Sequence, residues 1–321
     1  MKPRIHLALA ALGLLSSAAF SLECSAAVPP LSNRTAFNDP KDAVSSLEQA
    51  LGEKSEAEAK HALLAIFGPE SKDMLSSGDP VDDKLALESF KEALQERVEV
   101  ATSHIVGPAK QEVPVAVLIV GQQKWPFPIA LIKSDAGWQF DTEVGRQEII
   151  DRRIGENELK VLSLFPEYVA AQHEYSALPQ NKDHAFATKF LSSPGAQDGL
   201  YWPAQKGQPL SPIGPLVANA ADAGYEAHAD GSATPFFGYY FRILTSQGKN
   251  ARGGAMNYIV NGKMTQGFAL LAYPAKWDRS GAMSFLVGPD GVIYQKNLGA
   301  KTAEIAAKMT SFDPDPSWNP A

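Results

Sequence analysis

The stretch VEVATSHIVGPAKQEVPVAVLIVGQQKWPFPIALIKSDAGWQF, residues 98–140, decides the fold class. It is rich in β-branched and aromatic residues, which favour strands. Glycine and proline interrupt it at Gly107-Pro108 and over residues 121–126, and residues 134–137 have the composition of a turn. The stretch therefore predicts an antiparallel meander with strands over 98–106, 113–120, 127–132 and 138–140.

The sequence before this stretch has a helical pattern. Asn38 or Asp39 can cap a first helix whose first residue is a proline, because a proline at that position loses no hydrogen bond. A second helix is expected from about residue 55 to 67, and a third beginning near Asp79. Helices followed by an antiparallel meander predict an α+β domain over residues 37–142. Their order resembles the cone-shaped NTF2-like fold.

The sequence after the meander predicts a second part. Residues 143–183 form a helical connection, which Pro166 is expected to break or kink. Residues 184–321 are dense in glycine and aromatic residues and predict a C-terminal antiparallel β-rich domain, distantly similar to the soluble part of a pilin. Within it, Asn261-Gly262 predicts a hairpin, because both turn positions need a positive φ. Strands are expected over 235–244, 256–260, 267–273, 282–287 and 292–295.

The first residues have the pattern of a secretory signal. A short positive region with Lys2 and Arg4 precedes an apolar run too short, and too poorly flanked, for a membrane anchor. We expect a signal peptide over residues 1–27, cleaved near Ala27, and a linker over residues 28–36. Cleavage would remove Cys24, the only cysteine, so the exported chain would form no disulfide. The protein is therefore expected in the periplasm or outside the cell, with no stable membrane span after cleavage.

Charge and composition restrict the classes of partner. The chain has 29 basic and 36 acidic residues, a net charge of −7, and no basic run of four or more. This distribution lacks the electrostatic footprint of a nucleic-acid-binding protein. The histidines are too far apart in sequence for a helical zinc motif, so we expect no metal and no cofactor. The expected partner is another envelope protein or a saccharide or peptide ligand.

The second half contains short motifs rich in glycine and aromatic residues: DGLYWP (198–203), SPIGPL (211–216), GYYFRIL (238–244), GGA (253–255), NGKM (261–264), GFAL (267–270), SGAMSF (280–285) and YQKNLG (294–299). Together these motifs resemble those of a family of secreted bacterial proteins, domain of unknown function number 2950. The resemblance implies export but implies no activity. Phe237 stands where the family pattern leads us to expect a polar residue, often histidine, and Asn297 where we expect an acid. Both departures weigh against a catalytic role at these positions.

The aromatic residues of this half supply the candidate site. Tyr201 and Trp202 lie in one motif, and Tyr240 and Arg242 share one face of an expected strand because side chains alternate along it. Aromatic rings beside a guanidinium suit contacts with sugars, peptides or carboxylates. Core packing is the competing interpretation for the same rings.

These observations favour a non-enzymatic binding or assembly module. The alternative is a hydrolase acting on envelope material, with carboxylates or the pair His184 and His228 gathered by the fold. A third interpretation, a structural subunit of a surface assembly, requires a large apolar patch on the sheet.

Overall fold

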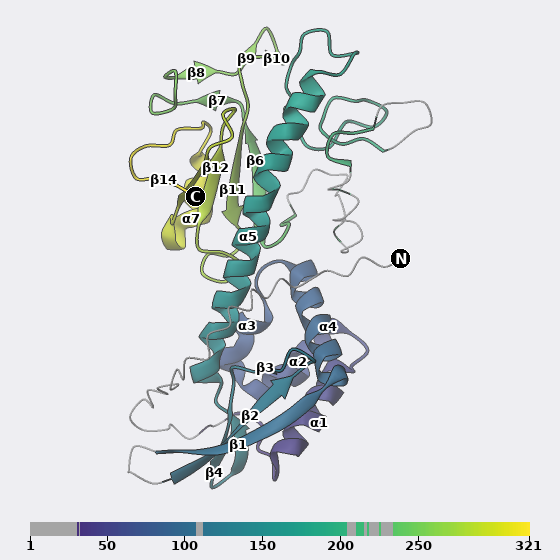
Figure 1. Ribbon diagram of the computed structural model, residues 1–321, viewed down its shortest axis with the longest axis vertical. Coiled ribbons are helices and arrows are strands. Elements are labelled where there is room, and N and C mark those ends of the chain that lie inside the picture. Colours follow the sequence, from purple (N-terminus) through teal and green to yellow (C-terminus); the bar gives the residue numbers. More distant parts are fainter. Residues whose placement is uncertain are drawn as a thin grey trace.

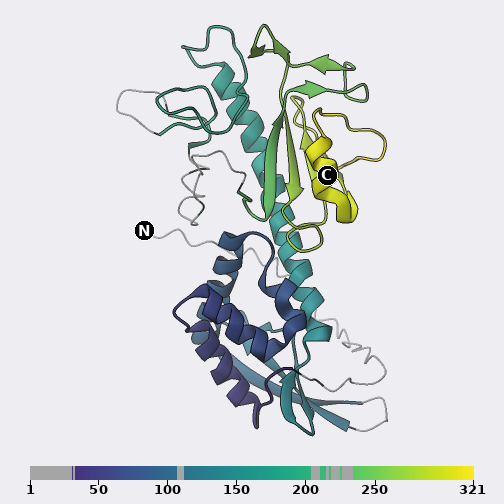
Figure 2. The same ribbon diagram turned by 180° about the vertical axis from the view of Figure 1, so that it is seen from behind.

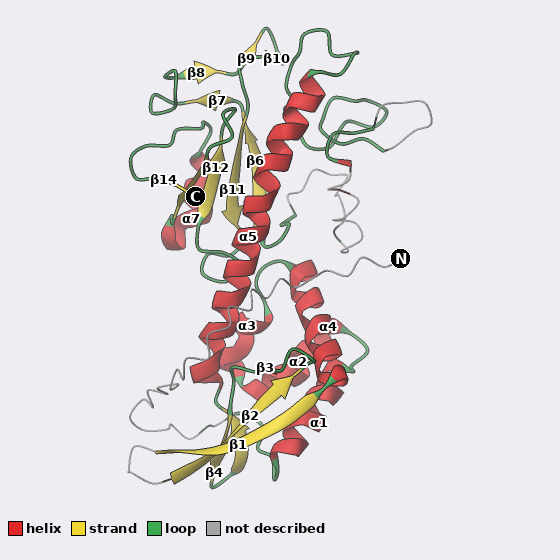
Figure 3. Ribbon diagram, viewed as in Figure 1, coloured by secondary structure: helices red, strands yellow, loops and turns green. Residues whose placement is uncertain are grey.

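The computed structural model describes residues 31, 33–106, 112–203, 210–214, 217, 225 and 234–321. The expected signal peptide, with its cleavage site and Cys24, lies outside the described residues. The chain forms two lobes that share one long helix, α5 (Thr142–Ser176), which runs along both of them (Figure 1). The expected α+β class is confirmed, since helices and antiparallel sheets occur in both lobes (Figure 3).

Side-chain caps fix where the helices of the N-terminal lobe begin. Asp39 caps α1 and Ser55 caps α2, each in a reciprocal capping box with the acidic residue three positions later. Asp79 caps α4 by accepting from two backbone N–H groups of its first turn. The expected helix starts are therefore confirmed. The helices of this lobe are α1 (Pro40–Leu51), α2 (Glu56–Phe67), α3 (Lys72–Leu75) and α4 (Pro80–Glu96), with a short 3-10 turn at Pro69–Ser71.

The N-terminal sheet has the order β1-β2-β4-β5, all antiparallel, with the short β3 paired to β2. Helices α1, α2 and α4 pack on it around a core that includes Leu47, Leu118 and Phe140. The strand expected over 127–132 begins only at Leu131, because Pro128 cannot donate to a ladder. The strands are β1 (Val98–Val106), β2 (Glu112–Val120), β3 (Trp125–Pro126), β4 (Leu131–Ser134) and β5 (Gly137–Phe140).

Helix α5 continues through Pro166, where the sequence predicted a break or a kink. Pro166 is exposed, so the carbonyl that loses its donor can be hydrated instead. The first turns of α5 contact the N-terminal lobe, whereas Val161 and Phe165 are buried in the core of the C-terminal lobe. None of the helices in the described part of the chain is long and apolar enough to cross a membrane.

The C-terminal lobe is built on a five-stranded antiparallel sheet in the order β14-β13-β12-β11-β6. The Asn261-Gly262 hairpin is confirmed, with φ of 51° and 78° between β9 and β10. The strand expected over 256–260 is divided at Tyr258, which is buried and donates its N–H to Thr245. The elements are β6 (Tyr239–Leu244), β7 (Ser246–Gln247), β8 (Met256–Asn257), β9 (Ile259–Val260), β10 (Lys263–Met264), β11 (Ala269–Pro274), β12 (Ser284–Val287), β13 (Ile293–Lys296), a 3-10 turn (Gly299–Lys301), α7 (Thr302–Lys308) and β14 (Asn319–Pro320).

The two faces of this sheet are covered by different helices. On one face, the ring of Phe285 packs against Phe165 of α5, with centroids 6.2 Å apart, and against Tyr239 at 6.0 Å. The other face carries α7, which lies across the sheet from α5 (Figure 2). Because side chains alternate along a strand, neighbouring residues of β6 meet different helices.

Candidate binding site

Two tyrosines lie side by side on the face of the sheet that carries α7. Tyr240 of β6 is paired in register with Tyr273 of β11, and their ring centroids are 5.5 Å apart at an interplanar angle of 38°. Both side chains are half-buried. Among the described residues, neither hydroxyl has a hydrogen-bond partner. The pair therefore presents two phenol groups that water or a ligand can contact, and we call it the tyrosine pair.

Arg242 lies two residues after Tyr240 on the same face, but its guanidinium is already engaged. It donates to the carbonyl oxygens of Ala306, Ala307 and Met309. These carbonyls lie at the C-terminal end of α7. The last carbonyl groups of a helix have no hydrogen-bond donor within the helix, and the helix dipole favours a positive charge beside them. Arg242 therefore fixes α7 on the sheet.

Arg242 also affects the tyrosine pair electrostatically. Burial raises the pKa of the Tyr273 hydroxyl, and the positive charge of Arg242 opposes part of that increase. Tyr273 is consequently neutral near pH 7 and able to donate a hydrogen bond. A saccharide hydroxyl or a peptide carbonyl is a suitable acceptor.

The other two predicted site residues lie in a segment that packs toward α5. Trp202 is only 4 % exposed. Tyr201 is half-buried and exchanges backbone hydrogen bonds with Phe190 and Ser192, and the ring of Phe190 contacts Tyr168 of α5. The structure thus brings Tyr240 and Arg242 together on one face and keeps Tyr201 and Trp202 in a different segment. Sequence reasoning missed Tyr273, because only the strand register places it beside Tyr240.

A buried carboxylate at the junction of the lobes is a second candidate. Asp79 is fully buried, and its Oδ2 accepts from the N–H of Gly238 at 2.8 Å and from the hydroxyl of Tyr225 at 3.0 Å. Its Oδ1 accepts from the N–H groups of Val81 and Asp82. Burial raises the pKa of Asp79, and these hydrogen bonds offset part of that shift. Because both oxygens are occupied by donors from the chain itself, the geometry gives Asp79 a structural role.

Two further carboxylates strengthen the same junction. Asp73 accepts from Lys276 and Arg279, each at 3.0 Å, and these bonds lower its pKa. Glu158 of α5 accepts from the N–H groups of Ala282 and Met283, both at 2.9 Å. These contacts hold the loop between β11 and β12 against α3 and α5.

The residues suggested for hydrolysis are not gathered into one cleft in the described part of the chain. His184 is exposed and its ring contacts the carbonyl of Ser176 at 3.0 Å, whereas His228 lies outside the described residues. No described histidine is hydrogen-bonded to a carboxylate, and no group of three or more potential metal ligands occurs among the described residues.

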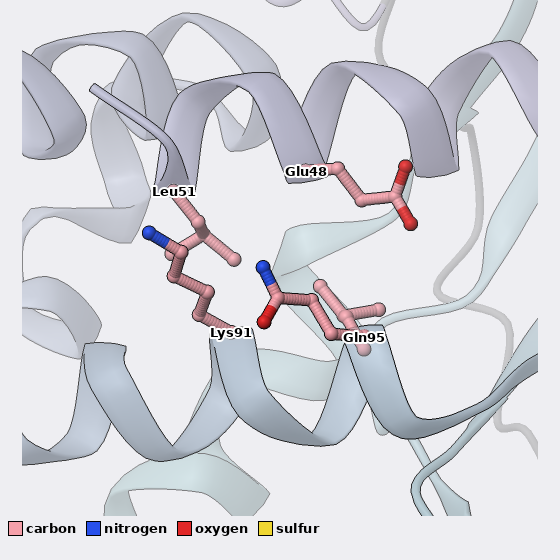
Figure 4. A pocket seen from close by; sticks show the side chains of 5 residues that line it. Glu48, Leu51, Lys91 and Gln95 are labelled. Atoms are coloured by element: carbon pink, nitrogen blue, oxygen red, sulfur yellow. The ribbon is translucent and has the colours of Figure 1, made fainter.

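Two depressions on the described surface are lined without histidine. One, of about 380 Å³, lies between α1 and α4, and its labelled side chains are Glu48, Leu51, Lys91 and Gln95 (Figure 4). Another, of about 410 Å³, is lined by Asn33, Leu64, Ala65, Pro69 and Lys72. Neither contains the pair of carboxylates or the acid–histidine pair that hydrolysis requires.

Comparison with known protein families identifies one that matches most of the chain. The family described as protein of unknown function (DUF2950) matches residues 34–321. The chain belongs to this family. The match includes both lobes and α5, so the expected resemblance is confirmed for nearly the whole described chain.

The comparisons extend no further. No curated protein and no solved structure matches the chain. The likenesses to the NTF2-like cone and to pilins are therefore not confirmed. At the two positions that depart from the expected family pattern, Phe237 occupies a turn with φ of 50°, and the side-chain oxygen of Asn297 accepts from the indole N–H of Trp277 at 2.9 Å.

Proposed function

We propose that this protein is exported to the bacterial periplasm or cell envelope and there acts as a non-enzymatic binding or assembly module. The observation that carries the proposal is the tyrosine pair, Tyr240 and Tyr273, on the α7 face of the C-terminal sheet. It would contact another envelope component through its rings and hydroxyls.

The surroundings of the pair support this role. Both residues lie on paired strands, so little conformational freedom is lost when a ligand binds. Tyrosine combines a large apolar surface with a polar end, and it is enriched in protein interfaces for that reason. Arg242 anchors α7 beside the tyrosine pair, so that the helix forms a fixed edge of the surface that carries the pair.

Export rests on the N-terminal sequence. The positive residues, the apolar run and the small residues before Val28 have the pattern of a cleaved signal. Cell fractionation combined with N-terminal sequencing of the mature protein tests it directly. A mature chain that begins near Val28 in the periplasmic or extracellular fraction supports export, whereas an intact N-terminus in the cytoplasmic fraction contradicts it.

Crosslinking in intact cells, followed by mass spectrometry, tests the binding role. We expect one reproducible envelope component to copurify with the wild-type chain and to be lost from Tyr240→Ala and Tyr273→Ala. Tyr201→Ala is the matched control, because Tyr201 is also half-buried but lies in a segment packed toward α5. Circular dichroism must show that all three variants fold. A partner retained by both variants of the tyrosine pair would overturn the proposed site.

Incubation with purified cell-wall material separates binding from hydrolysis. We expect the protein to sediment with the material, or to leave it untouched if the partner is a protein. Release of soluble fragments by the wild-type chain, and not by a variant that lacks His184 or His228, would overturn the non-enzymatic assignment in favour of the hydrolase.

A further inference from the structure

Strand β1 forms an open edge of the N-terminal sheet. It pairs with β2 over residues 98–106, and no other strand of the described chain pairs with its outer side. The opposite edge is protected, because Phe37 exchanges two backbone hydrogen bonds of 2.8 Å with Trp138 of β5. Proteins usually protect exposed edges with lysine, proline or a bulge. Along β1, every residue pairs in unbroken register with β2 and neither lysine nor proline occurs.

The hydrogen bonds of β2 show which backbone groups of β1 point outward. The N–H of Gly121 donates to Arg97, so the odd-numbered residues of β1 bond to β2. The carbonyl of Leu118, an even-numbered residue of β2, instead accepts from Phe127 on the side away from β1. The outward N–H and carbonyl groups of β1 therefore belong to its even-numbered residues: Val98, Val100, Thr102, His104 and Val106.

These outward groups are self-complementary. In a two-fold antiparallel pair with the axis perpendicular to the sheet, residues on the same face oppose each other, and outward groups must meet outward groups. Pairing Thr102 with Thr102 of a second copy meets both conditions along the whole strand. It places Val100 opposite His104 of the second copy, and Val98 opposite Val106.

The side chains also suit a second copy. Val106 is 70 % exposed, and this pairing would cover part of it with a valine. The whole chain carries a net charge of −7, but from Val100 to Val106 the edge contains no acid, lysine or arginine. Two copies can therefore approach along this part of the edge without placing like charges opposite each other.

We propose that two copies of this protein associate through antiparallel pairing of β1 around Thr102, which joins their N-terminal sheets into one continuous sheet. The interface lies in the N-terminal lobe and does not cover the tyrosine pair of the C-terminal lobe. It does not depend on the binding role proposed above. An interface formed by one strand from each copy is small, so the dimer should dissociate on dilution.

Sedimentation of the exported chain over a range of concentrations tests the association. We expect a species of twice the chain mass that dissociates on dilution. Thr102→Pro should sediment as a monomer, because proline removes the outward N–H and is tolerated at an edge without disturbing the bonds to β2. Thr102→Val keeps the N–H and should remain dimeric. A wild-type chain that stays monomeric at every concentration in the series would overturn the proposal.

Crosslinking tests the register even if Thr102→Pro fails to fold. Cys24 is the only cysteine in the sequence, so the exported form of Thr102→Cys would carry a single thiol. Residues directly opposite in a hydrogen-bonded pair lie about 5.5 Å apart at Cα, within reach of a disulfide. Thr102→Cys should therefore form a covalent dimer on mild oxidation. Glu99→Cys should not, because Glu99 would face Ile105 of the second copy. Equal crosslinking of both variants would contradict the pairing.

Discussion

The side chain of Asp79, at the start of α4, accepts a 2.8 Å hydrogen bond from the backbone N–H of Gly238, just before β6. This bond joins the two lobes at a residue that is also a helix cap. Gly238 has a φ of 73°, and a Cβ there would lie 2.6 Å from the side-chain nitrogen of Asn157. The position therefore requires glycine for both its conformation and its space.

Replacing Asp79 should weaken the whole fold. Asp79→Ala removes the cap of α4 and leaves the Tyr225 hydroxyl and the Gly238 N–H buried without an acceptor, so we expect a loss of about 2–4 kcal/mol in the free energy of unfolding. Asp79→Asn retains one acceptor oxygen and should lose less. Urea denaturation measures both. A change below about 0.5 kcal/mol in Asp79→Ala, the range of ordinary surface substitutions, would contradict this role.

Two glycines of α5 should respond in opposite directions to alanine. A Cβ at Gly145 would lie 2.3 Å from the carbonyl oxygen of Pro128, a backbone atom that cannot move freely, whereas a Cβ at Gly155 meets no atom within 4 Å. We expect Gly145→Ala to destabilise the protein by about 1–3 kcal/mol through overpacking. Gly155→Ala should stabilise it by about 0.5–1 kcal/mol through helix propensity. Thermal unfolding of the two variants provides the comparison, and equal shifts in Tm would contradict the packing at Gly145.

Arg242 should act on α7 rather than on a ligand. Arg242→Ala removes the donor to the helix carbonyls, and we expect a loss of about 1–3 kcal/mol together with faster amide exchange in residues 302–308. Arg242→Lys replaces the planar guanidinium, which donates several N–H groups at once, by a single ammonium. It should therefore restore only part of the protection of the α7 amides against exchange. Hydrogen exchange read by mass spectrometry measures this locally. Unchanged exchange in α7 would show that the guanidinium is free to serve a partner.

Acid should remove the stabilisation of the folded state that the ionised carboxylate of Asp198 provides. Asp198 is exposed, and although desolvation of its carboxylate raises the pKa, hydrogen bonds from Lys189 and Ser193 outweigh that effect and lower the pKa from 3.8 to about 2. The folded state therefore favours the ionised carboxylate, so this contribution is present above pH 3.8 and is lost as the pH falls to about 2. Unfolding titrations across this window should show a flatter pH dependence for Asp198→Asn. An unchanged slope would contradict the shift.

The sequence predicted the elements whose ends depend on local chemistry. The caps at Asp39 and Asp79, the change to strands at Val98 and the Asn261-Gly262 turn each depend on residues a few positions apart. Backbone conformation and capping act over that range, so one sequence suffices to place them. Pro128 is a similar local signal, since it cannot donate to a ladder, but its effect on the start of β4 was missed.

The sequence by itself determined the fold class, the starts of the helices and membership of the family. Tertiary structure alone decided which side chains of each strand face α5 or α7, that Tyr273 is the neighbour of Tyr240, and that Arg242 is used by a helix end. The physical reason is that strand register and helix placement depend on contacts between residues far apart in the sequence. An alternating pattern identifies two faces, but only the packed fold determines what covers each of them.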